Sequence, residues 1–137
     1  MELYDTVYID YPLPIPSDLP AVIRSYIAYE MFAGSFKTDD MYQALRSYEV
    51  DQGGQIFEVD HFHFESNGQP EKYKMDITKK LTVYTYVYPR EFDSYEEVPE
   101  RFRLEYDLYF EDGILIAADF IKPIGDFKNE FELHRSI

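Results

Sequence analysis

Two histidines separated by one residue are the best candidates for metal chemistry in this sequence. His61 and His63 lie in a run that predicts a β-strand, in which residues two apart point to the same side. Their imidazoles could share one metal ion, which would require a further ligand. Glu65, Asp119 and the more distant His134 are the groups available for that role. The alternative is a pair of ordinary histidines on an edge strand.

Other catalytic signatures are missing from the sequence. With 27 aspartates and glutamates, a pair of carboxylates for general acid and base chemistry carries little information. There is no GxxxxGK[ST] phosphate loop, no GxGxxG, no GxSxG elbow and no HExxH. The absence of cysteine excludes a thiolate nucleophile, a disulfide framework and cysteine-ligated zinc. The sequence therefore predicts a protein that is not an enzyme and requires no cofactor.

One segment combines acidic with aromatic side chains. Residues 89–100, PREFDSYEEVPE, are predicted to form the longest loop, and the acids continue into the strand pair that follows. Carboxylates can bind arginine or lysine of a partner, while tyrosine and phenylalanine supply buried anchors. The predicted partner-binding residues are Glu91, Phe92, Asp93, Tyr95, Glu96, Glu97, Glu100, Glu105, Asp107, Glu111 and Asp112. Two alternatives would argue against this surface. Arg101 and Arg103 could neutralise its acidic side chains, or residues 89–100 could be a solvated loop without a partner.

The charge balance favours a basic partner. The chain has 27 acidic and 13 basic residues, a formal net charge of −14, which opposes direct binding of nucleic acid or anionic lipid. The acidity either keeps an aromatic-rich surface soluble or lets the protein dock, as a nucleic-acid mimic, onto a basic groove of another protein. The N-terminus lacks the features of a signal peptide, and no apolar run is long enough to span a bilayer. We therefore expect a cytoplasmic protein.

The strongest structural pattern is a hairpin over residues 101–121. Apolar and polar residues alternate before Asp112-Gly113, a dipeptide typical of a type I′ turn. A two-residue turn predicts the opposed pairs Phe110 and Leu115, Leu108 and Ala117, and Leu104 and Ile121. The same register places Asp119 opposite Tyr106. We expect the Tyr106 hydroxyl to donate a hydrogen bond to the Asp119 carboxylate. The alternative is that Asp119 is a catalytic acid with a raised pKa.

The remaining patterns predict a single α+β domain over residues 1–137. We expect a strand over residues 3–11, an extended proline segment, and an amphipathic helix over residues 18–33 that packs on the sheet. Further strands flank the Gly53-Gly54 turn and the turn at residues 66–70, while residues 41–45 form either a helical turn or part of a strand. The prediction is a mainly antiparallel sheet of six or seven strands.

The strand over residues 81–88 carries bulky side chains on both faces, as expected for a central strand. One face is aliphatic, and the other contains Tyr84, Tyr86 and Tyr88. Such an aromatic face could instead hold two copies of the chain together. A virion or assembly protein that forms a homo-oligomer is therefore an alternative to a binding protein, alongside a small enzyme built around the two histidines.

Several short motifs resemble those of a group of small uncharacterised phage and prophage proteins. The motifs are Tyr4-Asp5 followed by Tyr11-Pro12-Leu13-Pro14, Phe36-Lys37-Thr38-Asp39-Asp40, the tyrosine-containing hairpin over residues 48–56, and Leu104-Glu105-Tyr106 with Asp112-Gly113-Ile114-Leu115. This chain departs from the group in its inserted helix and in Tyr4, where the group has phenylalanine. The resemblance implies no catalytic residues. It implies a phage accessory protein that binds and inhibits or modulates a host or defence protein in the infected bacterial cytoplasm.

Overall fold

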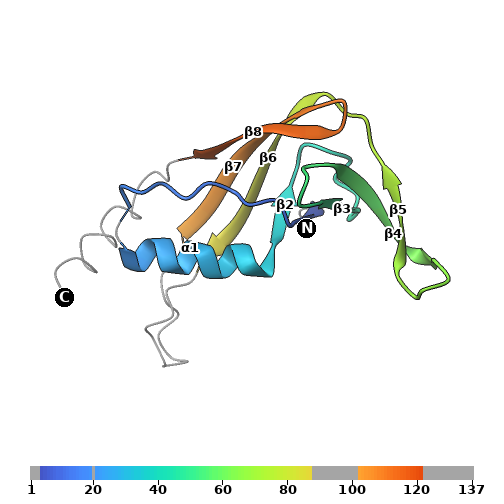
Figure 1. Cartoon of the computed structure of the whole chain (residues 1–137), viewed down its shortest axis with the longest axis horizontal. Helices are drawn as coiled ribbons and strands as arrows, with labels where there is room; N and C mark the ends of the chain where they lie inside the picture. Colours follow the sequence, from blue (N-terminus) through green and yellow to red (C-terminus); the bar gives the residue numbers. More distant parts are fainter. Residues whose placement is uncertain (1–3, 20, 88–101, 122–137) are drawn as a thin grey trace.

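Eight β-strands and one helix make up the described part of the chain, which in this computed structural model comprises residues 4–19, 21–87 and 102–121 (Figure 1). The elements are β1 (Asp5–Ile9), α1 (Ala21–Ala33), β2 (Ser35–Thr38), β3 (Ser47–Val50), β4 (Ile56–Phe64), β5 (Pro70–Lys74), β6 (Lys79–Val87), β7 (Phe102–Glu111) and β8 (Ile114–Ile121). The predicted α+β class is confirmed. The predicted six or seven strands were too few, because strands as short as β2, with four residues, hardly display an alternating pattern.

The strands form one mixed sheet in the order β5-β4-β3-β1-β2-β6-β7-β8. β1 pairs in parallel with β3, whereas its other neighbour, β2, is antiparallel to it. The prediction of an antiparallel sheet was therefore wrong at this pair. The parallel pairing arises from the connection after β2. This connection passes around the start of β1 and leads into β3 on the other side of β1. Alternation within a strand reports which face is buried and says nothing about the direction of its neighbour. The predicted central position of β6 is confirmed.

The sheet curls into a half-barrel whose concave face holds the core (Figure 1). The largest fully buried side chains include Tyr48, Tyr106 and Phe36, with aliphatic residues from six of the strands around them. At one end the curl brings the start of β4 to the start of β8, where Gln55 and Ile114 form an isolated bridge. Backbone hydrogen bonds also join the two regions, with the Ile56 amide donating to the Gly113 carbonyl at 2.9 Å.

The helix lies against the core as predicted, and the proline segment, expected only to be an extended connector, also contributes to the core. Ile23, Tyr26 and Ile27 of α1 are buried, and Leu13 of the proline segment joins the same cluster. The Tyr106 hydroxyl donates to the Pro14 carbonyl at 2.7 Å, which ties this segment to β7. The helix begins at Ala21 rather than Asp18, because residues 17–18 form a turn, and Gly34 follows its last residue with a φ of 70°.

The β7–β8 hairpin has the predicted turn and a different register. Asp112 and Gly113 both have positive φ, at 50° and 80°, as a type I′ turn requires. Phe110 pairs with Leu115 as predicted, but the register then shifts by one residue. The observed pairs beyond that shift are Tyr109 and Ala117, Leu108 and Ala118, Asp107 and Asp119, Tyr106 and Phe120, and Glu105 and Ile121. The predicted pairs of Leu108 with Ala117, Leu104 with Ile121, and Tyr106 with Asp119 were therefore wrong.

A β-bulge explains this difference. Ile116 has no partner in β7, and this extra residue reverses the inward and outward positions along the rest of β8. Tyr106 consequently faces Phe120, with ring centroids 5.6 Å apart, while Asp119 is exposed. The polar pair that the two-residue turn predicted does not form.

Asp5, at the start of β1, holds the connection between β2 and β3. Its side chain is fully buried. Oδ2 accepts the backbone amides of Tyr42 at 2.8 Å and Gln43 at 2.9 Å, and Oδ1 accepts those of Ala44 at 3.0 Å and Arg46 at 2.8 Å. Gln43 and Leu45 adopt positive φ values of 51° and 56° within this loop. Residues 41–45 are thus neither a helical turn nor a strand, because the loop is shaped around one carboxylate.

Replacing Asp5 with asparagine should destabilise the fold. The Asp5→Asn side chain keeps its size but exchanges one acceptor oxygen for an NH₂ group that faces two amide donors. We expect the free energy of unfolding to fall by about 2–4 kcal/mol, measured by urea denaturation. Asp10→Asn, at an exposed position just after β1, is the matched control and should change little. Equal stability of the two variants would contradict this role for Asp5.

Adding a methyl group at Gly113 should break the contact between the sheet ends. A Cβ there would lie 1.9 Å from the Met75 carbonyl oxygen, in a backbone conformation with a φ of 80°. Gly68 has a similar φ of 83°, but no atom lies within 4 Å of its Cβ position. We expect Gly68→Ala to lower the free energy of unfolding by about 1 kcal/mol and Gly113→Ala by at least about 3 kcal/mol. Equal losses in thermal or urea unfolding would show that the contact has no energetic value.

Candidate functional site

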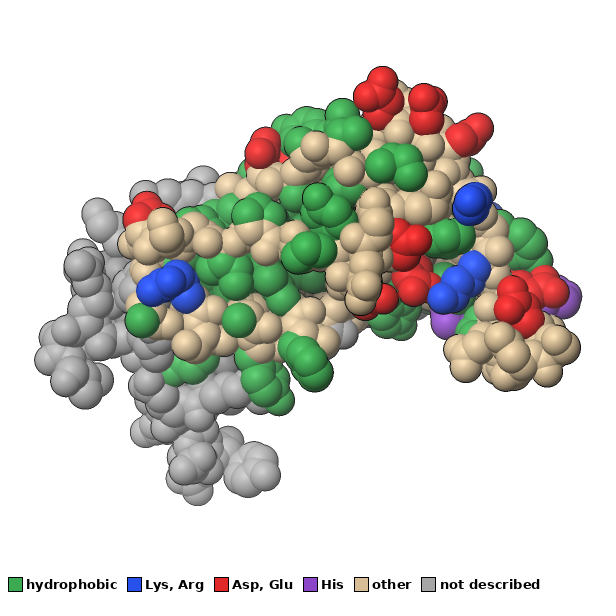
Figure 2. Space-filling view, viewed as in Figure 1, with side chains coloured by type: hydrophobic (Ala, Val, Ile, Leu, Met, Phe, Trp, Pro, Cys, Tyr) green, Lys and Arg blue, Asp and Glu red, His purple; other side chains and the backbone are tan. Residues whose placement is uncertain are grey.

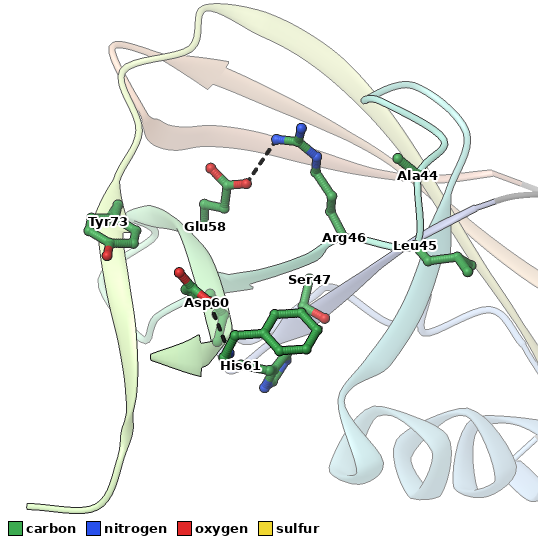
Figure 3. Close-up of a pocket in the computed structure, with 10 residues that line it drawn as sticks. Ala44, Leu45, Arg46, Ser47, Glu58, Asp60, His61 and Tyr73 are labelled. Carbon is green, nitrogen blue, oxygen red and sulfur yellow. Dashed lines mark hydrogen bonds and ion pairs between the residues drawn. The ribbon is translucent and has the colours of Figure 1, made fainter. Parts of the chain in front are cut away.

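A pocket of about 330 Å³ lies where the β2–β3 connection meets β4 and β5 (Figure 3). It brings together a guanidinium, two carboxylates, an imidazole and two aromatic rings. The lining residues are Ala44, Leu45, Arg46, Ser47, Glu58, Val59, Asp60, His61, Phe62 and Tyr73. Three separate segments of the chain therefore supply its walls.

The fold positions Arg46 and Glu58 side by side in the lining of the pocket. The Arg46 amide is bound by Asp5, and the sheet register sets Glu58 between Tyr48 on β3 and Tyr73 on β5. Opposed residues share a face of the sheet, so Glu58 and Tyr73 point to the same side. Arg46 Nη1 lies 3.0 Å from Glu58 Oε1 (Figure 3).

The Arg46 guanidinium also lies over an aromatic ring. Its central carbon is 4.3 Å from the centroid of the Tyr42 ring, within the range of a cation–π contact. Its side chain remains 46% exposed, and that of Glu58 is 35% exposed. The pair therefore forms a solvent-accessible wall in which a guanidinium contacts both a carboxylate and an aromatic ring.

Asp60 organises the opposite end of the pocket. Its Oδ1 accepts the Phe62 amide at 2.9 Å, and its Oδ2 lies 2.7 Å from His63 Nδ1. The hydrogen bond from Phe62, and then the one from His63, lowers the pKa of the Asp60 carboxyl below its ordinary value. The pairing of β4 with β5 shifts between Asp60 and Phe64, so the regular alternation of the strand stops here.

The two histidines do not form a metal centre with other described residues. His61 lines the pocket, whereas His63 is directed at Asp60. Within residues 4–19, 21–87 and 102–121, no group of three or more histidine, cysteine or acidic side chains could hold an ion. Asp119 lies on β8, opposite Asp107, and His134 lies outside the described residues. The expectation that both imidazoles point to the same side assumed a regular strand. The pairing of β4 is irregular between Asp60 and Phe64, so that assumption does not hold for this pair.

Large apolar side chains are exposed around the pocket. Phe62 is 92% exposed, Leu45 63%, Tyr42 61%, Phe64 60% and Tyr73 49%. The β4–β5 hairpin that carries three of them projects away from α1 (Figure 1), and we call it the β4–β5 arm (Ile56–Lys74). Figure 2 shows acidic and histidine side chains at the end of this arm. Clustered apolar side chains at a surface are typical of an interaction site.

The sequence marked the arm only through His61 and His63, as a candidate metal site, and did not identify it as an interaction surface. The residues of β4 alternate without a clean apolar face, and the connection that completes the pocket has no motif. The only signal was the unusual density of Phe62 and Phe64 beside His61 and His63. The pocket depends on contacts between segments distant in sequence.

The predicted acidic surface is only partly described, and part of it is neutralised. Glu91, Phe92, Asp93, Tyr95, Glu96, Glu97 and Glu100 lie outside the described residues. Glu105 Oε1 is 2.8 Å from Arg103 Nε, as anticipated for a neutralising arginine. Asp107 accepts the Thr82 hydroxyl at 2.7 Å and lies 4.0 Å from Lys80 Nζ. Glu111 and Asp112 are exposed at the β7–β8 turn, so the described acids form no continuous unpaired strip.

The predicted tyrosine face is only partly exposed among the described residues. Tyr84 is only 8% exposed, and the Arg103 guanidinium lies 3.9 Å from the centroid of its ring. Tyr86 is half-buried, and Tyr88 lies outside the described residues. The outer surface of β6 thus offers little free aromatic area among the described residues.

A second, mostly apolar groove of about 420 Å³ lies between the proline segment and α1. Asp10 is its one charged lining residue among those described, and Phe32 on its rim is 95% exposed. The first pocket is the better functional candidate, because its lining includes a guanidinium, two carboxylates and an imidazole, and several of these groups are held by ion pairs or hydrogen bonds.

Comparison of the chain with protein-family models, curated proteins and solved structures finds no match. Among the described residues, no helix is long and apolar enough to cross a membrane.

The lowered pKa of Asp60 predicts a local response to acid. A carboxyl with a lower pKa in the folded state stabilises the fold above its ordinary pKa, and this contribution is lost as pH falls through the folded-state pKa. We therefore expect residues 60–63, at the irregular end of β4, to lose order in that acidic range. The Asp60 carboxyl can be followed by ¹³C NMR and the Phe62 amide by ¹⁵N NMR.

Two histidine variants test the cause of the shift. His63→Ala removes one of the groups that lower the Asp60 pKa, so the pKa should rise part of the way towards its ordinary value, because the Phe62 amide remains. His61→Ala is the matched control and should leave it unchanged. A His63→Ala variant with an unaltered Asp60 titration would refute the assignment.

Proposed function

We propose that this chain is a non-enzymatic binding protein that attaches to a basic surface of another protein through the β4–β5 arm. The observation that carries the proposal is the group of exposed aromatic side chains around an acid-containing pocket. Phe62, Phe64 and Tyr73 are exposed and can be buried by a partner, and Glu58 and Asp60 line the pocket together with Phe62 and Tyr73. Aromatic anchors surrounded by polar groups are the usual composition of an interface centre.

The net charge supports the choice of a basic partner. At −14, the chain attracts cationic surfaces and repels phosphate backbones. Electrostatic attraction accelerates encounter, while the exposed rings of the arm supply the contacts that hold the complex. The acids of β7 contribute less than the sequence suggested, since Arg103 and Lys80 already lie beside two of them. The arm is therefore a better docking surface than the β7 edge.

The edge position of β5 adds a second element of support. β5 is the last strand of the sheet, so one side of its backbone is not paired with any described strand. Lys72 Nζ on this strand lies 2.6 Å from Glu49 Oε2. This ion pair partly compensates the Lys72 charge, which would otherwise repel a basic partner. A partner could contact both the side chains and the outer backbone of the arm.

The resemblance to phage and prophage proteins suggests the class of partner. We propose a bacterial host or defence protein with a basic surface, including one that binds nucleic acid. Inhibition or modulation of that protein would follow from occupation of its basic surface. The proposal requires no cofactor and assigns no catalytic residue.

Capture of the partner from a bacterial lysate tests the function. The paired substitution of Phe62→Ser and Phe64→Ser should reduce capture by about tenfold or more, because both rings would be buried in the complex. The matched control is Phe32→Ser with Ile116→Ser, which removes two exposed apolar side chains elsewhere, one 95% and one 61% exposed.

Two results would contradict the proposal. In the first, no protein is enriched over an unrelated protein of the same net charge. In the second, the arm pair and the control pair reduce capture equally, which would move binding away from the arm.

A further inference from the structure

We infer that the pocket beside the β4–β5 arm binds an arginine side chain of the partner. The inference rests on the proposed function and specifies its chemistry, because it names the group that the acidic and aromatic walls recognise. Three features support it: the contacts of Arg46, the exposed aromatic rings of the lining, and the charge of the lining.

Arg46 shows that a guanidinium suits the Glu58 carboxylate of the lining together with an aromatic ring, here that of Tyr42, which lies outside the lining. Its guanidinium lies over the Tyr42 ring at 4.3 Å and donates to Glu58 Oε1 at 3.0 Å. A planar guanidinium can stack on a ring and donate from its edge at the same time, which an ammonium cannot do in the same way. Arg46 thereby occupies one wall of the pocket.

The opposite wall offers a second set of the same groups. Among the described residues, Glu58 Oε2 accepts no hydrogen bond, so the carboxylate retains acceptor capacity beyond its contact with Arg46. Tyr73 and Phe62 line the pocket with rings that are 49% and 92% exposed. In Figure 3, Tyr73 and Arg46 lie on opposite sides of Glu58. A second guanidinium could therefore stack on an exposed ring and share the carboxylate.

The charge of the lining favours a cation over other ligands. Glu58 and Asp60 carry two negative charges against the one positive charge of Arg46, and His61 adds a charge only when protonated. Glu71 Oε2 accepts the Tyr73 hydroxyl at 2.5 Å, which places a further carboxylate beside that ring. An anion would be repelled. A metal ion lacks a ligand set among the described residues, and both Asp60 oxygens already accept hydrogen bonds.

Small probes test the chemistry without knowledge of the partner. N-acetyl-arginine amide titrated into ¹⁵N-labelled protein should shift the amide signals of Glu58, Phe62 and Tyr73. N-acetyl-citrulline amide, a neutral molecule of nearly the same shape, should shift none of them. N-acetyl-lysine amide should bind about threefold or more weakly, because its ammonium gains less from stacking. Equal shifts from citrulline, or shifts spread over all acidic regions, would overturn the inference.

Two substitutions locate the binding. Glu58→Gln should weaken binding of the arginine probe by about fivefold, whereas Glu65→Gln, an exposed acid outside the pocket, should have no such effect. Because Glu58 also pairs with Arg46, Phe62→Ala provides a second variant whose side chain is too exposed to affect folding. Unchanged probe affinity in both variants would overturn the inference.

The same variants separate this inference from the proposed function. If the arm pair abolishes partner capture while Glu58→Gln captures as well as the wild type, the binding function stands and arginine recognition fails. If no partner is captured but the arginine probe binds in the pocket, arginine recognition stands and the proposed binding function fails.

Discussion

The buried carboxylate of Asp5 is the constraint on which the rest of the structure depends. A buried charge without a cation is costly unless hydrogen bonds compensate it, and four backbone amides do so here. These bonds force the connection after β2 around the start of β1, which places β3 beside β1 in parallel. The same connection brings Arg46 to Glu58. One side chain therefore contacts the connection that links β2 to β3 and that also supplies Arg46 to the pocket.

The closure of the half-barrel divides the sheet into a stable body and a projecting arm. The β7–β8 turn is seated against the start of β4 and the end of the segment after β5, where Gly113 donates its amide to the Ile77 carbonyl at 2.8 Å. Beyond this contact residues 57–60 of β4 are half-buried, and residues 61–64 are all exposed. The arm consequently presents aromatic rings to solvent from a rigid base. This arrangement limits the conformational entropy lost when a partner binds.

Local patterns predicted the local structure well. The Asp112-Gly113 turn, the helix before Gly34 and the central strand β6 follow from alternation, turn residues and helical spacing. Ile116 shows the limit of such reasoning, because a single unpaired residue reverses the faces of β8 and nothing in its identity announces a bulge. The pocket was beyond prediction for a related reason: Arg46, Glu58 and Tyr73 meet only through strand pairing. Asp5 appeared to be an ordinary polar residue of an alternating strand until the loop around it was seen.

The position of β1 between two later strands affects how the protein is made. β1 leaves the ribosome before β2 and β3, and it cannot pair with either until residues 35–50 have been synthesised. At translation rates of roughly 5–20 residues per second, β1 remains unpaired for several seconds. During that time Asp5 is hydrated, and Val7 and Ile9, later fully or almost fully buried, are exposed to solvent. The apolar face of β1 therefore stays uncovered until the loop that encloses the Asp5 carboxylate has been made.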